Sequence, residues 1–390
     1  MEPLKFDVVI VGGGLVGLAF AARLANSGLR LALVEKHTPQ RQSGWDSRIY
    51  AFSPSNVQAL QKLGTWSRVD PNRVASVQKM CIQGDQPQGQ LAFSAYETGV
   101  ESLAWIAESQ QVLCALWEQI QQQANVTCFC PARSQSATWH DDYASLTLDN
   151  GLRLHAQLLI GCDGRHSWLR EQAGIHIHAT PYHQQGVVAN FRCEKPHRGT
   201  AYQWFRPDGI LAYLPLPEQH ISMVWSAPDD FAAELVTLPP DTLAQRVATA
   251  GEYRLGALSS ITPAAAFPLR LMQAEKMVAP RLALLGDAAH NVHPLAGQGV
   301  NLGFQDAWVL ADILNQRQVG ETVGDYTVLR RFERQRQEDI FAMAFVTDNL
   351  HRLFYRCDAS PVAWLRNAGL ALTNQLSPLK TLLIRQAIGV

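Results

Sequence analysis

Three glycines near the start of the chain have the spacing of a turn that binds the diphosphate of a dinucleotide. Gly12, Gly14 and Gly17 follow an apolar segment, residues 8–11, and precede a segment with helical spacing. Gly12 permits a tight turn, Gly14 lets the backbone approach a pyrophosphate, and Gly17 lets the helix pack against the strand. The phosphates are expected on the unpaired amides at the start of the helix. The residues predicted to form this site are Gly12, Gly13, Gly14, Leu15, Val16 and Gly17.

A carboxylate follows at the distance that such a turn requires for binding ribose hydroxyls. A second apolar segment, residues 31–34, ends at Glu35, which lies 23 residues after Gly12. Because this carboxylate is expected about 20 residues beyond the glycine turn, we predict that Glu35 binds the ribose and that Lys36 lies beside the nucleotide. The pattern predicts an adenine nucleotide with a diphosphate and leaves both FAD and NAD open.

The composition is typical of a globular enzyme. Of the 390 residues, 47% are hydrophobic and 17% are charged, and the formal net charge is −1. This balance, without a basic tail, offers no attraction for nucleic acid. The seven cysteines include no C-x-x-C pair, and the sequence has no cluster with metal-ligand spacing, no signal peptide and no long apolar run. We therefore expect a cytoplasmic protein with reduced cysteines and no bound metal.

The hydrophobic periodicity predicts an α/β fold, in which an antiparallel sheet is inserted into a Rossmann-like nucleotide-binding domain. Helices are predicted over residues 54–64, 109–123, 299–314 and 326–345. Residues 182–270 have strand patterns rich in aromatic side chains, which indicate a substrate domain or an aromatic core without a ligand. The predicted segments are 1–75, 106–180 and 273–345 for the nucleotide domain, 76–105 and 181–272 for the substrate domain, and 346–390 for C-terminal helices.

Two further strand-to-helix turns each contain an aspartate. Asp163 and Gly164 end an apolar strand ahead of a helix that Ser167 can cap. Gly286 and Asp287 end another apolar strand, and the glycine-flanked start of a helix, residues 297–301, follows ten residues after Asp287. One loop can therefore present an acceptor for a sugar hydroxyl together with a set of backbone amides.

These three motifs, in this order and with these separations, resemble those of the group A flavoprotein monooxygenases, the single-component aromatic hydroxylases. The resemblance covers nearly the whole chain. Residues 46–53, 205–216 and 364–370 narrow it to the ubiquinone-biosynthesis hydroxylases of bacteria. The resemblance implies FAD as the cofactor and NAD(P)H as a transient co-substrate, because the chain has only one Rossmann fingerprint.

The resemblance also implies contacts to the cofactor. Asp287 would bind the ribityl chain, and residues 297–301 would cover the N1 and O2 edge of the flavin, which is negatively charged in the reduced state and suits a helix start. The region of Asp163 and Gly164 would contribute to NAD(P)H binding. The cofactor residues implied in this way are Arg48, Gln110, Asp163, Gly164, Gly286, Asp287, Pro294, Gly297, Gln298, Gly299, Val300 and Asn301.

Two of these residues have alternatives. Arg48 matches a flavin-contacting arginine of the family, but a surface arginine is the other interpretation. Gln110 stands next to Ser109, where the family often has Asn or Gln near the flavin, so Gln110 is the substitute we predict for that contact.

The implied reaction is hydroxylation of the ring of a polyprenylated phenol or benzoquinol in ubiquinone biosynthesis. In this family NAD(P)H reduces FAD, oxygen adds at the flavin C4a, and the hydroperoxide delivers one oxygen to an electron-rich ring. Tyr213 and Pro294 match positions that line the cavity before the flavin. His290 and His293 lie in the loop after Asp287, where a structural hydrogen bond is the more common role. The sequence therefore does not identify a general base.

Three questions stay open at the sequence level. The substrate can instead be a small soluble phenol or benzoate, and the chain can instead be a flavin-binding assembly protein without turnover. Residues 361–390 contain no carboxylate but include Arg366, Lys380 and Arg385. This segment is either a helix pair packed on the FAD domain or an interfacial helix that admits a prenylated substrate from the inner face of the cytoplasmic membrane. Other quinone-biosynthesis proteins are candidate partners.

Overall fold

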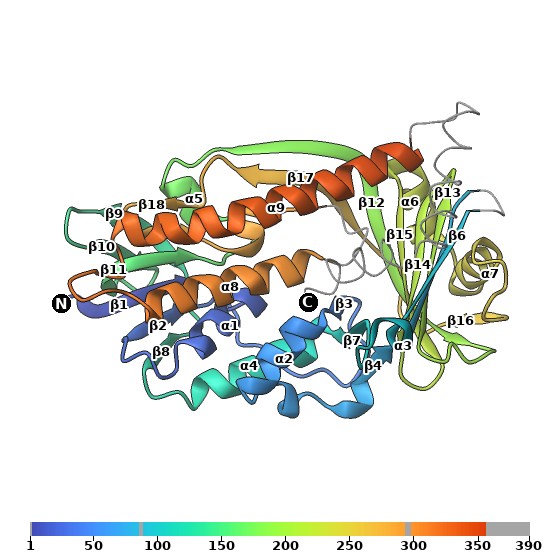
Figure 1. Cartoon of the computed structure of the whole chain (residues 1–390), viewed down its shortest axis with the longest axis horizontal. Coiled ribbons are helices and arrows are strands. Elements are labelled where there is room, and N and C mark those ends of the chain that lie inside the picture. Colours follow the sequence, from blue (N-terminus) through green and yellow to red (C-terminus); the bar gives the residue numbers. More distant parts are fainter. Residues whose placement is uncertain (1, 86–88, 293–297, 356–390) are drawn as a thin grey trace.

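The computed structural model describes residues 2–85, 89–292 and 298–355 of the chain. Two large sheets lie at opposite ends of an elongated molecule, and long helices run between them (Figure 1). Some of the residues predicted above lie outside this description, namely His293, Pro294, Gly297 and most of the predicted C-terminal helices, residues 346–390.

The first sheet is built on parallel strands. β1 (Leu4–Val11) pairs in parallel with β11 (Arg153–Gly161) on one side and with β2 (Leu31–Val34) on the other. β8 (Val126–Phe129) and β19 (Leu282–Leu284) extend the sheet in parallel beyond them. Central parallel strands are covered on both faces, which explains their uninterrupted apolar runs. The antiparallel edge strands are β9 (Ser134–Trp139), β10 (Ala144–Leu148) and β18 (Val278–Ala279).

A row of helices packs on this sheet. α1 (Leu15–Arg23) lies between α4 (Ser109–Gln121) and α8 (Gly299–Asn315), and α9 (Tyr326–Tyr355) packs on α8. α9 continues past the first sheet toward the second (Figure 1). The short helix α5 (Trp168–Gln172) follows β11.

The second sheet is largely antiparallel. Its longest strand, β12 (Ile177–Cys193), pairs with β15 (His220–Pro228) and with β17 (Ala265–Ala274). β14 (Gly209–Leu216) and β13 (Thr200–Arg206) continue the sheet from β15. The remaining strands are β5 (Lys79–Gln83), β6 (Gln90–Ser94), β16 (Leu258–Ser260) and β20 (His290–Asn291).

The two faces of the second sheet have different environments. Helices α6 (Asp229–Thr237) and α7 (Pro240–Ala250) cover one face, where Tyr213 and Trp225 belong to a buried apolar core. We call this the outer face and the opposite one the inner face. Because side chains alternate along a strand, the neighbours of Tyr213 point to the inner face.

A small third sheet lies beside the inner face. β3 (Ile49–Phe52) and β4 (Val74–Val77) pair with β7 (Ala104–Glu108), and short helices α2 (Pro54–Lys62) and α3 (Ala95–Thr98) flank these strands in the chain. An apolar cluster joins this sheet to the second one; its buried members are Ile49, Val77, Ala95, Leu103, Ile106, Ala201 and Leu216.

The predicted fold class is confirmed: an α/β nucleotide-binding fold carries an inserted antiparallel sheet. The predicted helices at 54–64, 109–123 and 299–314 match α2, α4 and α8 closely. α9 extends ten residues beyond the predicted end at residue 345, because neither glycine nor proline interrupts the chain before Tyr355. The six cysteines of the described residues are unpaired. The division into six segments stays a prediction.

Candidate functional site

The glycine turn is closed toward the protein and open on its other side. Gly12 has φ +107°, and a Cβ added there would lie 2.4 Å from the carbonyl oxygen of Cys162. A Cβ on Gly17 would lie 2.1 Å from the carbonyl oxygen of Gly12. No atom lies within 4 Å of a Cβ built on Gly14, the residue before α1. The turn therefore requires glycine where it meets protein and leaves room for a ligand at the start of the helix.

Glu35 lies directly beside this turn. Its Oε2 accepts a 2.6 Å hydrogen bond from the Gly13 amide, and its Oε1 accepts bonds of 2.7 Å from the Lys36 amide and 3.1 Å from the His37 amide. Three backbone donors therefore hold the carboxylate at the end of β2. A carboxylate can accept about four hydrogen bonds, so the arrangement fits a ribose hydroxyl as a further donor.

The other two predicted turns meet the glycine turn at one edge of the first sheet. The Cys162 amide, next to Asp163, donates to the carbonyl of Val11 at 2.8 Å. A Cβ added to Gly286 would lie 3.1 Å from Cγ2 of Val16 on α1, so the turn before Asp287 packs directly on that helix. Three motifs that are far apart in sequence are therefore adjacent in space, as expected for the carboxyl ends of neighbouring parallel strands.

Asp287 is accessible to solvent, but neighbouring protein atoms enclose most of its carboxylate. This enclosure raises the pKa of the Asp287 carboxyl, and the nearby His290, a hydrogen bond from Asn291 and the nearby Arg165 partly offset the effect. Burial raises the pKa of Tyr50, and the charge of Asp287 adds to this effect, which places Tyr50 near the carboxylate. An enclosed but accessible carboxylate suits the binding of a ligand hydroxyl.

The side chain of Asp163 serves the protein itself. Its Oδ2 accepts a 3.0 Å hydrogen bond from the Leu169 amide at the start of α5, while its Oδ1 is buried and has no hydrogen-bond partner among the described residues. Burial raises the pKa of this carboxyl, and its bonds to the start of α5 oppose that rise. If this turn binds a nucleotide, as predicted, the contact would come from its backbone. Gly164 in this turn has φ +83°.

Arg48 and Gln110 are brought together by Asp46. One carboxylate oxygen of Asp46 accepts from the Arg48 amide at 2.9 Å and the other from the Gln110 amide at 3.2 Å. The exposed Arg48 guanidinium lies 5.8 Å from the ring centroid of Phe267 on β17, so it bridges toward the second sheet. The Gln110 side-chain amide donates to the Gln40 carbonyl at 2.6 Å, so its contact with the flavin stays a prediction.

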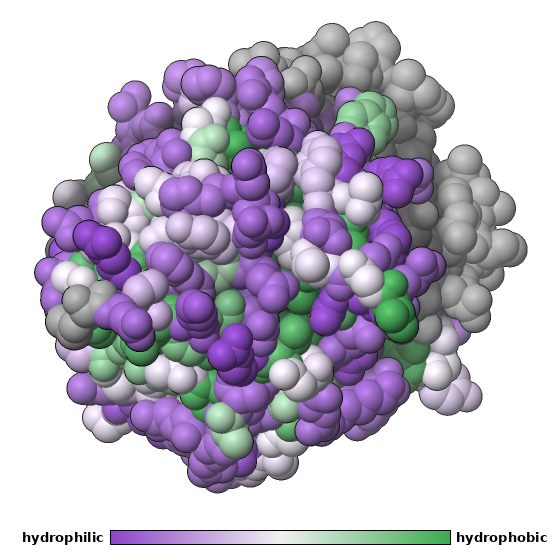
Figure 2. All heavy atoms as spheres, turned by 90° about the vertical axis from the view of Figure 1, so that its left-hand side faces the viewer, coloured by the Kyte–Doolittle hydropathy of each residue, from purple (hydrophilic) through white to green (hydrophobic). Residues whose placement is uncertain are grey.

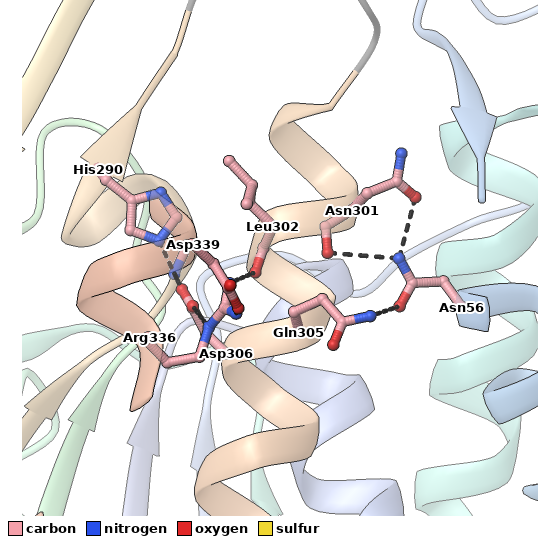
Figure 3. Close-up of polar contacts among 9 residues, drawn as sticks. Asn56, His290, Asn301, Leu302, Gln305, Asp306, Arg336 and Asp339 are labelled. Atoms are coloured by element: carbon pink, nitrogen blue, oxygen red, sulfur yellow. Dashed lines mark hydrogen bonds and ion pairs between the residues drawn. The ribbon is translucent and has the colours of Figure 1, made fainter. Parts of the chain in front are cut away.

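The side chain of Asn301, one of the residues predicted to cover the flavin edge, is held by the protein itself. Its Oδ1 accepts from the Ser53 amide at 2.9 Å, its Nδ2 donates to the Ala51 carbonyl at 2.8 Å, and the residue is 5% exposed. Asn56 also donates to its Oδ1 (Figure 3). The side chain fastens α8 to the β3–α2 connection, so only the backbone of Asn301 can face a cofactor. Gln298, Gly299 and Val300 are half-buried at the start of α8.

Tyr213 does not line a cavity before the flavin, which corrects the prediction. It is 1% exposed on the outer face, and its hydroxyl donates a 2.6 Å hydrogen bond to the Val247 carbonyl of α7. Burial raises the pKa of its phenol above the ordinary value of 10.0. The sequence pattern locates the strand correctly, but alternation places this side chain on the face covered by helices.

The inner face supplies side chains that the sequence analysis missed. Val188, Ala212, Leu214 and Val224 are half-buried, although their strands are central in the sheet. Asn190, on the same face as Val188, donates to the Asp46 carbonyl at 3.0 Å. The inner face therefore lies against the loop that carries Asp46 and Arg48. The sequence signal for the inner face is strand alternation: its residues stand at alternate positions to Tyr213 and Trp225 of the outer face.

Comparison with known proteins agrees with this geometry. Residues 5–344 match the FAD binding domain family. The 3-demethoxyubiquinol 3-hydroxylase of Escherichia coli (strain K12) is 35% identical over 390 aligned residues, which cover 98% of each chain. Ubiquinone hydroxylase UbiL of Rhodospirillum rubrum is 33% identical, with 98% of this chain and 89% of UbiL aligned. The chain belongs to the FAD-dependent aromatic hydroxylases of the ubiquinone family.

Solved structures agree with the fold of this hydroxylase. PqsL of Pseudomonas aeruginosa, in complex with 2-aminobenzoylacetate, superposes with a TM-score of 0.78 at 22% identity, covering 94% of this chain and 99% of PqsL. The p-nitrophenol 4-monooxygenase PnpA of Pseudomonas putida DLL-E4 gives 0.80 at 18% identity, covering 100% and 99%. FAD supplies the redox chemistry of the hydroxylase, in which NAD(P)H provides electrons and one oxygen atom of O₂ enters the ring.

Proposed function

We propose that this hydroxylase acts on the ring of a polyprenylated phenol or benzoquinol in ubiquinone biosynthesis. The single observation that carries the proposal is the approach of the inner face to residues 46–48, the loop before β3, whose neighbour Tyr50 lies near Asp287. The Arg48 guanidinium lies near the ring of Phe267, and Asn190 donates to the carbonyl of Asp46, so a ring on the inner face would lie beside the loop that leads to the proposed cofactor site. Two relatives that match nearly the whole chain are named for ubiquinone or demethoxyubiquinol hydroxylation, which supports the same substrate class.

The chain's residues have distinct proposed roles toward FAD. The amides of the glycine turn bind the pyrophosphate, Glu35 accepts hydrogen bonds from the adenosine ribose, and Asp287 accepts them from the ribityl chain. The start of α8 presents its backbone to the negatively charged edge of the reduced flavin. Asp287→Ala should therefore lose the yellow cofactor on purification, whereas Asp149→Ala, in a surface turn, should retain it. Tightly bound FAD in the Asp287 variant would refute this assignment.

The inner face is the proposed substrate surface. Val188, Ala212, Leu214 and Val224 are apolar and half-buried, so they suit a ring and the first part of an apolar tail. These side chains exclude water from one side of the site, so that the activated oxygen is transferred to the ring and is not lost in a side reaction with water. NAD(P)H has no second Rossmann fingerprint to occupy, so we propose that it binds transiently near the backbone of Asp163 and Gly164.

Access for a prenylated substrate favours a peripheral position on the inner face of the cytoplasmic membrane. In the described part of the chain, no helix has the length and hydrophobicity needed to span a membrane. The carboxyl half of α9 exposes Phe341 and Phe345, whose rings stack with centroids 6.2 Å apart, and Val346. By contrast, the visible face at the opposite end of the molecule is mostly hydrophilic, with scattered apolar residues (Figure 2). We propose that this end of α9 contributes to membrane contact.

Vesicle binding tests the membrane contact. Phe341→Ser combined with Phe345→Ser should reduce co-sedimentation with vesicles of anionic and zwitterionic phospholipid. Val319→Ser is the control, because Val319 is also an exposed apolar residue but lies in the loop between α8 and α9. Equal binding of both variants and the unmodified protein would contradict a role for α9.

The substrate class is tested by the intermediate that accumulates when this protein is removed from its own cell. The proposal predicts a prenylated ring that lacks one hydroxyl group, and its loss when the gene is restored. Accumulation of a small phenol or benzoate, with normal quinone, would show a soluble substrate. Normal levels of every aromatic intermediate in both strains would favour an assembly protein without turnover.

A further inference from the structure

Two charged side chains are buried in apolar stripes of neighbouring helices. Asp306 on α8 is fully buried between Leu302 and Leu310, which lie one turn before and after it. Arg336 on α9 is 2% exposed and occupies the same kind of position between Phe332 and Ile340. Burial of a charge is costly unless the charge is paired and hydrogen-bonded. We therefore asked which partners these two side chains bind and what the contacts hold in place.

Asp306 connects three elements of the flavin site (Figure 3). Its Oδ2 accepts a 2.9 Å hydrogen bond from the Gly286 amide and lies 2.6 Å from Nε2 of His290. Its Oδ1 accepts a 2.8 Å hydrogen bond from Nε of Arg336. The carboxylate therefore joins the loop around Asp287 to both α8 and α9.

The contacts on the loop lie on both sides of Asp287. Gly286 precedes it by one residue and His290 follows it by three. Gly286 has φ +57°, a backbone conformation that few other residues adopt, so the direction of the next side chain depends on how this amide is held. A carboxylate that binds both ends of the loop fixes the orientation of Asp287.

Arg336 holds this carboxylate from the other side. In addition to Asp306, it donates to Asp339 at 2.6 Å and to the carbonyl of Leu302 at 3.4 Å. Burial alone would raise the pKa of Asp306, but the charges and hydrogen bonds of His290 and Arg336 hold it below the ordinary value of 3.8. Asp306 is therefore ionised near neutral pH and acts as an acceptor toward all three donors.

We propose that Asp306 and Arg336 are positioning residues for the flavin: Asp306 orients the loop that presents Asp287, and Arg336 transmits the position of α9 to that loop. Neither residue is expected to touch the cofactor, and both act through Gly286 and His290. The chain thus sets the flavin-binding geometry partly from a helix that contributes no contact to the nucleotide itself. The proposal requires FAD binding at Asp287 but no particular aromatic substrate.

A second ion pair on α8 provides a matched control. Asp312, six residues after Asp306, accepts hydrogen bonds of 2.9 and 3.2 Å from the guanidinium of Arg23 on α1. This pair also joins α8 to another helix, but the side chain of Asp312 is 41% exposed, and its hydrogen bonds go to Arg23 and not to the loop around Asp287. Asp312→Asn should therefore show any effect of weaker anchoring of α8, but it should not change the positioning of the flavin.

The test compares holoprotein variants Arg336→Gln, Arg336→Lys, Asp306→Asn and Asp312→Asn. FAD affinity is measured by flavin fluorescence on dilution, together with the flavin absorption spectrum and reduction potential, at a temperature where circular dichroism shows each variant folded. Arg336→Gln should raise the Kd for FAD about tenfold, which corresponds to one lost charged hydrogen bond, and should shift the spectrum. Arg336→Lys should restore part of the affinity, and Asp312→Asn should stay within about twofold of the unmodified protein.

The results separate positioning from a merely structural role. Lower thermal stability in the Arg336 variants, with the Kd, spectrum and potential of the unmodified protein, would overturn the proposal. An equal rise of the Kd in Asp312→Asn would also overturn it. Asn at position 306 keeps one acceptor oxygen and turns a donor toward the other partners, so this variant can fail to fold. In that case the comparison of Arg336→Lys with Arg336→Gln decides.

Discussion

The amide nitrogen of Gly13 lies 2.6 Å from a carboxylate oxygen of Glu35, although 22 residues separate them in the chain. The turn that would bind the pyrophosphate and the acid that would bind the ribose are therefore held together by the protein itself. Preorganisation of this kind lowers the cost of ordering the site when a nucleotide binds.

Glu35→Gln tests this pair. Glutamine keeps one acceptor oxygen but loses the charge and the second acceptor, so FAD should bind about tenfold more weakly. Asp7→Asn is the control, because Asp7 accepts a 2.7 Å hydrogen bond from the Arg30 amide ahead of β2. Titration of the apoprotein with FAD by fluorescence measures both. Equal affinities of the Glu35 variant and the unmodified protein would place the ribose elsewhere.

Alanine substitutions at two glycines should separate folding from binding. Gly17→Ala places a Cβ 2.1 Å from the Gly12 carbonyl oxygen, which forces α1 away from β1, so unfolding free energy should fall by about 1–3 kcal/mol or more. Gly14→Ala meets no atom within 4 Å, and Gly14 has φ −74°, so the melting temperature should change little. The added methyl group should nevertheless weaken FAD binding. A destabilised Gly14 variant with full affinity would contradict this division.

The two faces of the second sheet should respond differently to substitution. Tyr213→Phe removes the hydrogen bond to the Val247 carbonyl and should lower stability by about 1–3 kcal/mol while leaving KM unchanged. Ala212→Phe fills the half-buried inner face and should raise KM for the aromatic substrate with FAD still bound. Steady-state kinetics and thermal unfolding measure both. A raised KM in Tyr213→Phe would restore Tyr213 to the substrate cavity.

Asp306 should make an acid-dependent contribution to stability. Its pKa is lower in the folded state than the ordinary 3.8, because His290 and Arg336 outweigh the effect of burial. The stability from its ionised form is therefore complete above the ordinary pKa and is lost as pH falls through the lower, folded value. Unfolding by denaturant across this acidic range should show a steeper loss for the unmodified protein than for Asp306→Asn. Parallel curves would show that Asp306 is not held ionised.

Local patterns predicted the nucleotide half of this molecule well, for physical reasons. The glycine turn and the helices α2, α4 and α8 depend on nearby residues, and their predicted positions agree with the structure. Tyr213 was misplaced, because its face depends on which side of the sheet α6 and α7 cover, and nothing local to β14 specifies that. The partners of the Asn301 side chain, Ala51 and Ser53, lie about 250 residues away in the sequence, so no local pattern could identify them.

The buried pair of Asp306 and Arg336 had a signal that the sequence analysis did not use. Each charged residue interrupts an apolar stripe of period four, with Leu302 and Leu310 around Asp306. A charge in such a position predicts a buried partner of opposite sign, but the sequence does not identify the partner. The two residues are 30 positions apart in the sequence, and the packing of α9 on α8 brings them together.

The most direct test of the account follows oxygen into the product. Purified holoprotein, NAD(P)H and ¹⁸O₂ should convert a prenylated phenol into a product with one ¹⁸O atom on its ring, detected by mass spectrometry. Soluble phenols should be converted poorly under the same conditions. Incorporation of oxygen from water, or efficient conversion of soluble phenols with none of the prenylated compound, would contradict the proposed function.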